Sequence, residues 1–200
     1  MKTQPLRRTN GFTLVELLVV ITIIAVLAGA GFAAGNSAIQ RAKKTTALAT
    51  CTALESAVSN FYTEYGAMPT DKTTDTPALR TDNDTLLKIL LGLEGTGTTV
   101  LNTRSIKFLS VKEGKKKGAS GGINGLIYND SGAVTGLFDP WGGPYFVMLD
   151  ADYDERVAPT PSAGGTAVTL NGRRAAAWSN GADAVSGSGG KASDDVTSWK

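Results

Sequence analysis

The sequence predicts an α+β fold in which one long N-terminal helix packs on a small antiparallel sheet. Three observations lead to this class. An apolar run of nearly membrane-spanning length stands near the start of the chain, and an amphipathic helical pattern follows it. The second half of the chain contains short strand-like segments separated by glycine-rich connections. We expect the first half of the long helix to be embedded in a membrane.

The apolar run covers residues 17–34, where Thr22 is the only polar side chain. At ~1.5 Å per residue, a helix of this length nearly crosses a hydrocarbon core of ~30 Å. The residues before Glu16 include Lys2, Arg7 and Arg8 and no acidic residue. Because positive charges are retained on the cytoplasmic side, the N-terminus is expected there, with the rest of the chain outside.

Glu16 stands at the entrance of this run, four residues after Phe12. A carboxylate in an apolar bundle is tolerated when an opposite charge neutralises it, and an ionisable residue within a membrane is usually functional. We therefore expect Glu16 to be paired. The alternative is that its side chain only reaches the lipid headgroups.

Two cleavage sites compete. A cut after the small residues Ala28-Gly29-Ala30 would release a soluble domain, as in a secretory signal peptide. Against this cut, the apolar core exceeds the usual length of ~7–15 residues, has an acid in its first turn and continues past the site. A cut between Gly11 and Phe12 would instead retain the helix.

The segment "GFTLVELLVVITIIAVLA" closely resembles the class III signal of type IV pilins and type II secretion pseudopilins. These signals have Gly before the cut, Phe after it and Glu at the fifth mature position. The resemblance implies that a prepilin peptidase cleaves between Gly11 and Phe12 and methylates the new amine of Phe12. It further implies that Glu16 pairs with the N-terminal amine of a neighbouring subunit as the filament grows. Many relatives carry a helix-bending proline where this chain has Ala33.

This interpretation divides the chain into three parts. Residues 1–11 are the prepilin leader, and residues 12–35 are the transmembrane and assembly helix. Residues 36–200 are a periplasmic pilin-like globular domain that includes the second half of the long helix.

The amphipathic pattern after Gly35 predicts that the helix continues to Gly66 and Pro69, which form a typical helix end. Its apolar positions are Ile39, Leu48, Cys51, Leu54, Val58, Phe61, Tyr62 and Tyr65. A second, short helix is predicted in "TDNDTLLKILLGLEG", with Asp82 or Asn83 as the N-cap and Gly95 as the stop.

Strands are predicted at "SIKFLSV", "PYFVMLD" and "RRAAAWS". The acidic segment "LDADYDER" has Asp150, Asp152 and Asp154 at alternate positions. It lacks the Gly and Glu of an EF-hand loop, which favours a hairpin turn. Lys115 to Lys117 are interpreted as a solvated hairpin tip, although contact with an acidic partner surface or with lipid headgroups is an alternative.

Two elements in the second half resemble major pseudopilins of type II secretion systems. "FDPWGGPYFVML" resembles their "DPWG-x-PY" element, and its turn is expected to place Trp141 and Tyr145 against the sheet. The tail "WSNGADAVSGSGGKASDDVTSW" resembles their calcium-binding final loop. The resemblance implies Asp183, Asp194 and Asp195 as Ca²⁺ ligands, completed by backbone carbonyls, a donor set that suits this ion. The alternative is a solvated loop with turn aspartates.

Composition excludes several function classes. The formal net charge is +2, and the leader supplies three positive charges, so the mature side chains sum to −1 and nucleic-acid binding is not expected. The chain has no histidine, the commonest general base and metal ligand. Its single cysteine, Cys51, falls on the apolar helix face and is expected to be buried and inert. No catalytic constellation is present, so we do not expect an enzyme.

The expected function is therefore that of a structural subunit of a type II secretion pseudopilus, supporting protein export. The resemblance implies as partners further copies in a helical homopolymer, minor pseudopilins, the inner-membrane assembly platform and the prepilin peptidase. It implies a single-pass protein of the bacterial inner membrane with its C-terminal domain in the periplasm, and a filament in the periplasm or at the cell surface. The alternatives are a minor pilin of a type IV pilus and a membrane-anchored binding domain that never polymerises.

Overall fold

The computed structural model describes residues 12–75, 79–82, 84–95, 97, 99–118, 121–161, 168–185 and 194–199, with the backbone alone at residues 30–34 and 84. The chain forms two compact units, Met1–Arg41 and Ala42–Lys200. The boundary falls within the first helix, α1 (Leu14–Tyr65). Each unit is described by itself.

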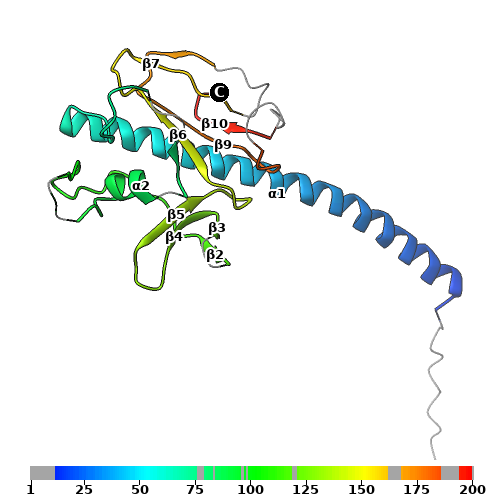
Figure 1. Cartoon of the computed structure of the whole chain (residues 1–200). Helices are drawn as coiled ribbons and strands as arrows, with labels where there is room; N and C mark the ends of the chain where they lie inside the picture. Colours follow the sequence, from blue (N-terminus) through cyan, green and yellow to red (C-terminus); the bar gives the residue numbers. More distant parts are fainter. Residues whose placement is uncertain are drawn as a thin grey trace, which may run out of the picture. The chain divides into compact units, whose positions relative to one another are not determined.

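Helix α1 is continuous over 52 residues, which confirms the prediction that the amphipathic segment continues the apolar run (Figure 1). It ends where the sequence predicts. Gly66 follows Tyr65 with a φ of 66°, and its N–H donates to the Tyr62 carbonyl at 2.8 Å. A glycine in this left-handed conformation is a common helix terminator, because it has no Cβ to clash.

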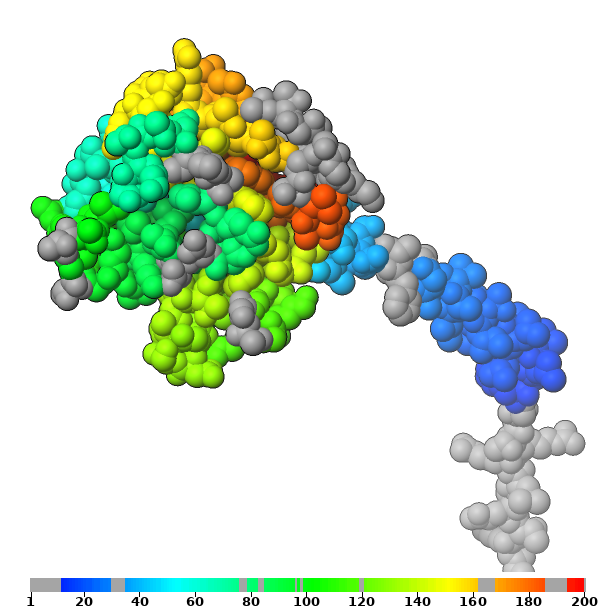
Figure 2. Space-filling model, in the orientation of Figure 1, coloured from blue at the N-terminus to red at the C-terminus, as the bar shows by residue number. Residues whose placement is uncertain are grey.

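The first unit has an exposed apolar surface. Phe12, Leu14 and Leu27 are 74%, 79% and 66% exposed, and the large apolar residues described between them are also mostly exposed. The described residues at the start of α1 are drawn in blue in Figure 2. In the described part of the chain, no helix combines the length and hydropathy needed to span a membrane.

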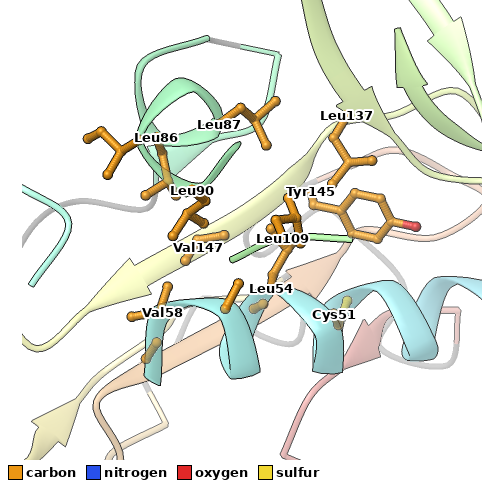
Figure 3. Packing of buried hydrophobic residues seen from close by; sticks show 14 of the residues in the cluster. Cys51, Leu54, Val58, Leu86, Leu87, Leu90, Leu109, Leu137, Tyr145 and Val147 are labelled. Carbon is orange, nitrogen blue, oxygen red and sulfur yellow. The ribbon is translucent and has the colours of Figure 1, made fainter. Parts of the chain in front are cut away.

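The second unit has the hydrophobic core, to which α1 contributes a single face. The buried residues of this face are Ala47, Cys51, Leu54, Ala57, Val58 and Phe61. Figure 3 shows that leucines of the short helix α2 (Asp84–Leu91) and Val147 of the sheet belong to the same cluster. Ile39 and Leu48 were predicted on this face, but they are 56% and 39% exposed. Ile39 precedes Ala47, the first buried residue described in α1, and Leu48 lies off the buried face.

The main sheet has four strands in the order β1-β6-β9-β10, all pairs antiparallel. Its bounds are β1 (Leu79–Arg80), β6 (Tyr145–Leu149), β9 (Ala175–Ser179) and β10 (Val196–Thr197). The predicted strands at "PYFVMLD" and "RRAAAWS" are its centre, with Val147 opposite Ala177. Together with α1 this sheet confirms the predicted α+β class.

Three two-stranded sheets complete the described structure. They pair β2 (Lys115–Lys117) with β3 (Gly121–Ile123), β4 (Gly125–Tyr128) with β5 (Val134–Phe138), and β7 (Arg156–Val157) with β8 (Leu170–Asn171). Lys115 to Lys117 are therefore a strand, and the interpretation as a hairpin tip is wrong. Their side chains are exposed, as predicted.

Two further predictions are corrected. The segment "SIKFLSV" is extended but is not a strand: the N–H groups of Phe108 and Leu109 both donate to the Leu90 carbonyl, so it closes the end of α2 instead of pairing in a sheet. Helix α2 ends before Gly92, with a φ of 70°, and not at Gly95. Asp82 binds the Arg80 guanidinium at 2.6 Å, and Asn83 lies outside the described residues.

Candidate functional site

The N-terminal site is built by the first turn of α1. Gly11 lies outside the described residues, and Phe12 is exposed. The backbone N–H and the hydroxyl of Thr13 donate to Oε2 of Glu16, at 2.9 and 2.7 Å, and the Glu16 N–H donates to Thr13 Oγ1 at 3.3 Å. This reciprocal arrangement is a capping box, which satisfies free N–H groups at a helix start.

The capping box fixes the position of the Glu16 carboxylate. Both hydrogen bonds from Thr13 use Oε2, so Oε1 has no partner among the described residues. Glu16 is thus held beside the start of the helix with one oxygen open to a group from outside the chain. Our sequence analysis missed the capping role of Glu16, although the pattern T-x-x-E at residues 13–16 is its usual signal.

The surroundings of Glu16 are apolar and uncovered. Val15 and Leu17, its sequence neighbours, are 68% and 57% exposed. A contiguous apolar surface of this kind indicates a protein–protein or membrane contact, because water is excluded from it at a gain in free energy. A carboxylate within that surface would be isolated from water once the surface is covered.

The tail brings together two of the three predicted metal ligands. The N–H of Asp183 donates to Oδ2 of Asp194 at 3.0 Å, across residues 186–193, which lie outside the described part. Gly181 adopts a φ of 70°, and a Cβ at this position would lie 2.1 Å from the Asp194 carbonyl oxygen. Only glycine permits this close approach.

Several buried oxygens of the tail lack hydrogen-bond partners among the described residues. They include Oδ1 of Asn180, Oδ1 of Asp194 and Oγ1 of Thr197. Buried polar atoms normally have partners, so such atoms call for an explanation, for which a bound ion is one candidate. Asp195 is half-buried next to β10, which pairs with β9 and anchors this end of the tail.

Among the described residues, a different group of three carboxylates could hold a metal ion. Asp75, Asp150 and Asp152 each offer an oxygen within 4.8 Å of the others. The N–H groups of Asp154 and Glu155 donate to Asp150, and that of Ala151 donates to Asp75. The group therefore stabilises a turn. The prediction of a hairpin turn is wrong, because β6 and β7 on either side of it do not pair with each other.

The pKa values of Asp75 and Asp150 are raised, first by burial and also by neighbouring carboxylates. Because hard oxygen ligands suit Ca²⁺, the group could hold a cation, but its hydrogen bonds already occupy several lone pairs. Sequence analysis missed Asp75, which stands 75 residues before Asp150. Only the fold brings the two together.

The turn at Asp139 is a buried polar centre. Its Oδ1 accepts hydrogen bonds from the N–H groups of Trp141, Gly142 and Gly143, and the Ser179 hydroxyl donates to Oδ2 at 2.6 Å. Burial nevertheless raises the pKa of Asp139. The turn connects β5 to β6 and binds the end of β9 through Ser179. It explains the "DPWG" sequence as a structural element, with Tyr145 buried as predicted.

Cys51 also behaves as predicted. It is fully buried, and burial raises the pKa of its thiol, so little reactive thiolate forms.

The comparisons with known proteins concern mainly the N-terminal part. The family described as the prokaryotic N-terminal methylation motif matches residues 6–32. The N-terminal part of the chain therefore resembles type IV pilins. It is 35% identical over 73 residues to a fimbrial protein of Neisseria meningitidis and 36% identical over 64 residues to the type IV major pilin protein PilE of Neisseria gonorrhoeae. These alignments cover 36% and 32% of this chain, and 43% and 38% of the relatives.

A third relative extends further along the chain. The fimbrial protein EcpC of Eikenella corrodens is 28% identical over 105 residues, 52% of this chain and 67% of that protein. The chain spans less than half the length of the two Neisseria relatives. No solved structure matches it. All three relatives are named for pili or fimbriae, which are structural assemblies, in agreement with the expectation that the chain is not an enzyme.

Proposed function

We propose that this chain is a structural subunit of a pilin-type filament that assembles through the N-terminal half of α1. The observation that carries the proposal is the coincidence of the methylation motif with an uncovered apolar helix and a positioned carboxylate, Glu16. A helix with this surface gains stability when identical helices or lipid cover it. Before assembly the subunit is held in the inner membrane by residues 12–35, with its globular domain in the periplasm.

Processing precedes assembly in this proposal. A prepilin peptidase cleaves between Gly11 and Phe12 and methylates the Phe12 amine. Mass spectrometry of the mature N-terminus tests this step. Gly11→Arg should block cleavage, because it places a long charged side chain beside the scissile bond. An N-terminus at Gly31 in the wild-type chain would show an ordinary signal peptide instead.

Glu16 then neutralises the N-terminal amine of a neighbouring subunit. Its Oε2 is occupied by Thr13, which leaves Oε1 for the incoming ammonium group. Charge pairing within an apolar bundle is strong, because little water screens it. The pair also gives the filament a fixed register, since each carboxylate requires one amine.

The test compares two variants of this turn. Glu16→Leu removes the charge and should abolish most filament assembly while leaving membrane insertion intact. Thr13→Ala removes the capping hydroxyl but keeps the carboxylate, and should assemble close to wild-type yield. Filament yield is measured by shearing and immunoblotting. Wild-type yield from Glu16→Leu would contradict the pairing and would favour a membrane-anchored domain that never polymerises.

We further propose that the filament is a type II secretion pseudopilus, with minor pseudopilins and the inner-membrane assembly platform as partners. The "DPWG" turn and the aspartate-containing tail support this assignment, because both resemble elements of major pseudopilins. The names of the three relatives favour a second candidate, a subunit of a type IV pilus. Deleting the gene and scoring protein export against surface pili distinguishes the two.

Calcium is part of the pseudopilin proposal. Asp183, Asp194 and Asp195 would hold the ion with backbone carbonyls, and the buried Asp194 Oδ1 without a partner fits this role. If Ca²⁺ binds only the folded state, it should add about 2.7 kcal/mol of stability at a hundredfold excess over Kd.

The measurement is the melting temperature of the detergent-solubilised full chain in calcium and in chelator. Asp194→Ala should remove most of the difference. Asp152→Ala, in the other carboxylate group, should preserve it. If Asp152→Ala loses the difference in melting temperature between calcium and chelator and Asp194→Ala keeps it, the ion binds the group of Asp75, Asp150 and Asp152 instead.

A further inference from the structure

A basic groove of about 640 Å³ lies in the second unit, beside the turn that follows Asp139. Lys43 of α1 and Lys112 and Lys115 around the start of β2 line it, together with one acidic residue, Glu113. The groove therefore carries two net positive charges. Its lysines come from segments about 70 residues apart, so that only the folded domain creates it.

The three ammonium groups are available to a ligand. Throughout the part of the chain that the structure describes, no carboxylate lies within 4.0 Å of the Nζ atoms of Lys43, Lys112 or Lys115. The neighbouring Lys116 is different: it binds Asp130 at 2.5 Å. Because alternate residues of a strand point to opposite faces, Lys115 and Lys116 of β2 point in opposite directions. Only Lys115 lines the groove, and only Lys116 pairs with Asp130.

The uncharged lining is amphipathic. Trp141 lies half-buried in the groove wall, with Pro140 and Ile123 beside it. Lysines next to an indole and apolar side chains are typical of the layer between membrane and water, where the ring has both an apolar and a polar surrounding.

The position of Lys43 in the sequence agrees with this layer. Lys43 follows the end of the apolar run by nine residues, which correspond to about 14 Å of helix. Headgroups extend about 5–8 Å beyond the hydrocarbon, and a lysine side chain is long enough to reach toward them. An acidic protein surface would explain the charge of the groove but not its tryptophan and apolar wall.

We propose that this groove binds the phosphate-bearing headgroups of anionic phospholipids while the subunit waits in the membrane. This inference rests on the proposed membrane-anchored state. Each lysine near an anionic surface raises affinity by a factor of about five. Headgroup binding holds the globular domain against the membrane, and the contact is released when the subunit is extracted into a filament.

The test uses the cleaved full chain in lipid nanodiscs of phosphatidylcholine, with and without about 30% phosphatidylglycerol. Lysine acetylation rates are read by mass spectrometry. With the anionic lipid, Lys43, Lys112 and Lys115 should react about fivefold more slowly, and about 0.5 M NaCl should remove the protection. Lys107 is exposed, lies outside the groove and should not change.

A matched pair of variants makes the test specific. The double variant Lys112→Gln and Lys115→Gln should lose the protection at Lys43, whereas Lys107→Gln should retain it. All three positions are exposed, so the fold should be unaffected, which the melting temperature checks.

Three outcomes would overturn the inference. Rates that do not respond to phosphatidylglycerol exclude headgroup binding. Protection that depends on two chains per nanodisc, and not on the lipid, assigns the groove to a second copy of the chain. Failure of the chain to enter nanodiscs contradicts membrane anchoring itself and thus the proposed function as well.

Discussion

The two halves of α1 differ in apolar content and in surroundings: residues 14–39 are apolar at most positions, whereas residues 40–65 have a single apolar face. In the first unit, Leu17 is 57% exposed and no described residue of the chain covers it. In the second unit, Leu54 is fully buried among α2, the sheet and the segment at Leu109. One helix therefore serves two purposes. Its second half is part of a self-contained core, and its first half presents an apolar surface that has to be covered from outside.

The comparison shows how a subunit can be stable before and after assembly. Burial of apolar surface is the main stabilising contribution in folding and in association. Here the two are separated along a single helix, so changes in one half should alter domain stability and changes in the other should alter assembly. The following predictions test that separation, from the largest expected effect to the smallest.

The largest contrast is between Leu54→Ala and Leu17→Ala. Removing the buried Leu54 side chain should lower the free energy of unfolding of the domain by about 2–5 kcal/mol, because it leaves a cavity. Leu17→Ala should not change it, since that side chain is mostly exposed and does not belong to the core. Thermal unfolding of the full chain in detergent measures both. Equal destabilisation by the two changes would break the separation.

Glycine substitutions give the next contrast. Gly181→Ala should destabilise the domain by about 2 kcal/mol, because its φ of 70° disfavours a Cβ and the Asp194 backbone occupies the space. Gly29→Ala has no atom within 4 Å of the new Cβ and should leave the melting temperature unchanged. It should slightly strengthen α1 locally. A neutral Gly181→Ala would show that the tail is not ordered by this contact.

Threonine substitutions should give a smaller effect. Buried Thr81 donates to the Leu137 carbonyl at 2.7 Å and accepts from the Tyr145 N–H at 2.8 Å. Thr81→Val should cost about 1–2 kcal/mol, because a buried N–H loses its acceptor. Thr22→Val in the first unit removes only a bond to its own helix and should not change domain stability. Chemical denaturation of both variants provides the check.

The smallest effect concerns pH. The pKa values of Asp75 and Asp150 are raised above the ordinary 3.8, so the folded state takes up their protons more readily than the unfolded state. Their contribution to stability is complete below that ordinary value and is lost as pH rises through the raised pKa values. Asp150→Asn, which removes one charge, should therefore weaken the stabilisation that accompanies mild acidification.

Asp130 provides a control of opposite sign. Its pairing with Lys116 lowers the pKa of Asp130, so its contribution is present at neutral pH and is lost on acidification through the lowered value. Melting temperatures between neutral pH and a pH of about 2 distinguish Asp150→Asn from Asp130→Asn. On acidification, stability should fall more steeply in Asp150→Asn than in Asp130→Asn. The reverse order would contradict the opposite signs of the two contributions.

The sequence by itself determined the elements whose signals are local. Continuous helical periodicity and Gly66 determined α1 and its end, and strand-like composition between glycine-rich connections determined β6 and β9. The capping box of Thr13 and Glu16 was equally local, because its T-x-x-E signal is contiguous in the sequence. The methylation motif, a contiguous segment, was recognisable for the same reason.

Only the tertiary structure decided the contacts between distant segments. The segment at Leu109 has strand-like composition, yet it binds the end of α2, where the Leu90 carbonyl accepts hydrogen bonds from the N–H groups of Phe108 and Leu109. Asp75 joins Asp150, and Ser179 joins Asp139, across gaps that no periodicity spans. Periodicity shows which side chains prefer burial, but the partner of a buried group depends on which surfaces meet when the chain closes, and this is a property of the whole fold.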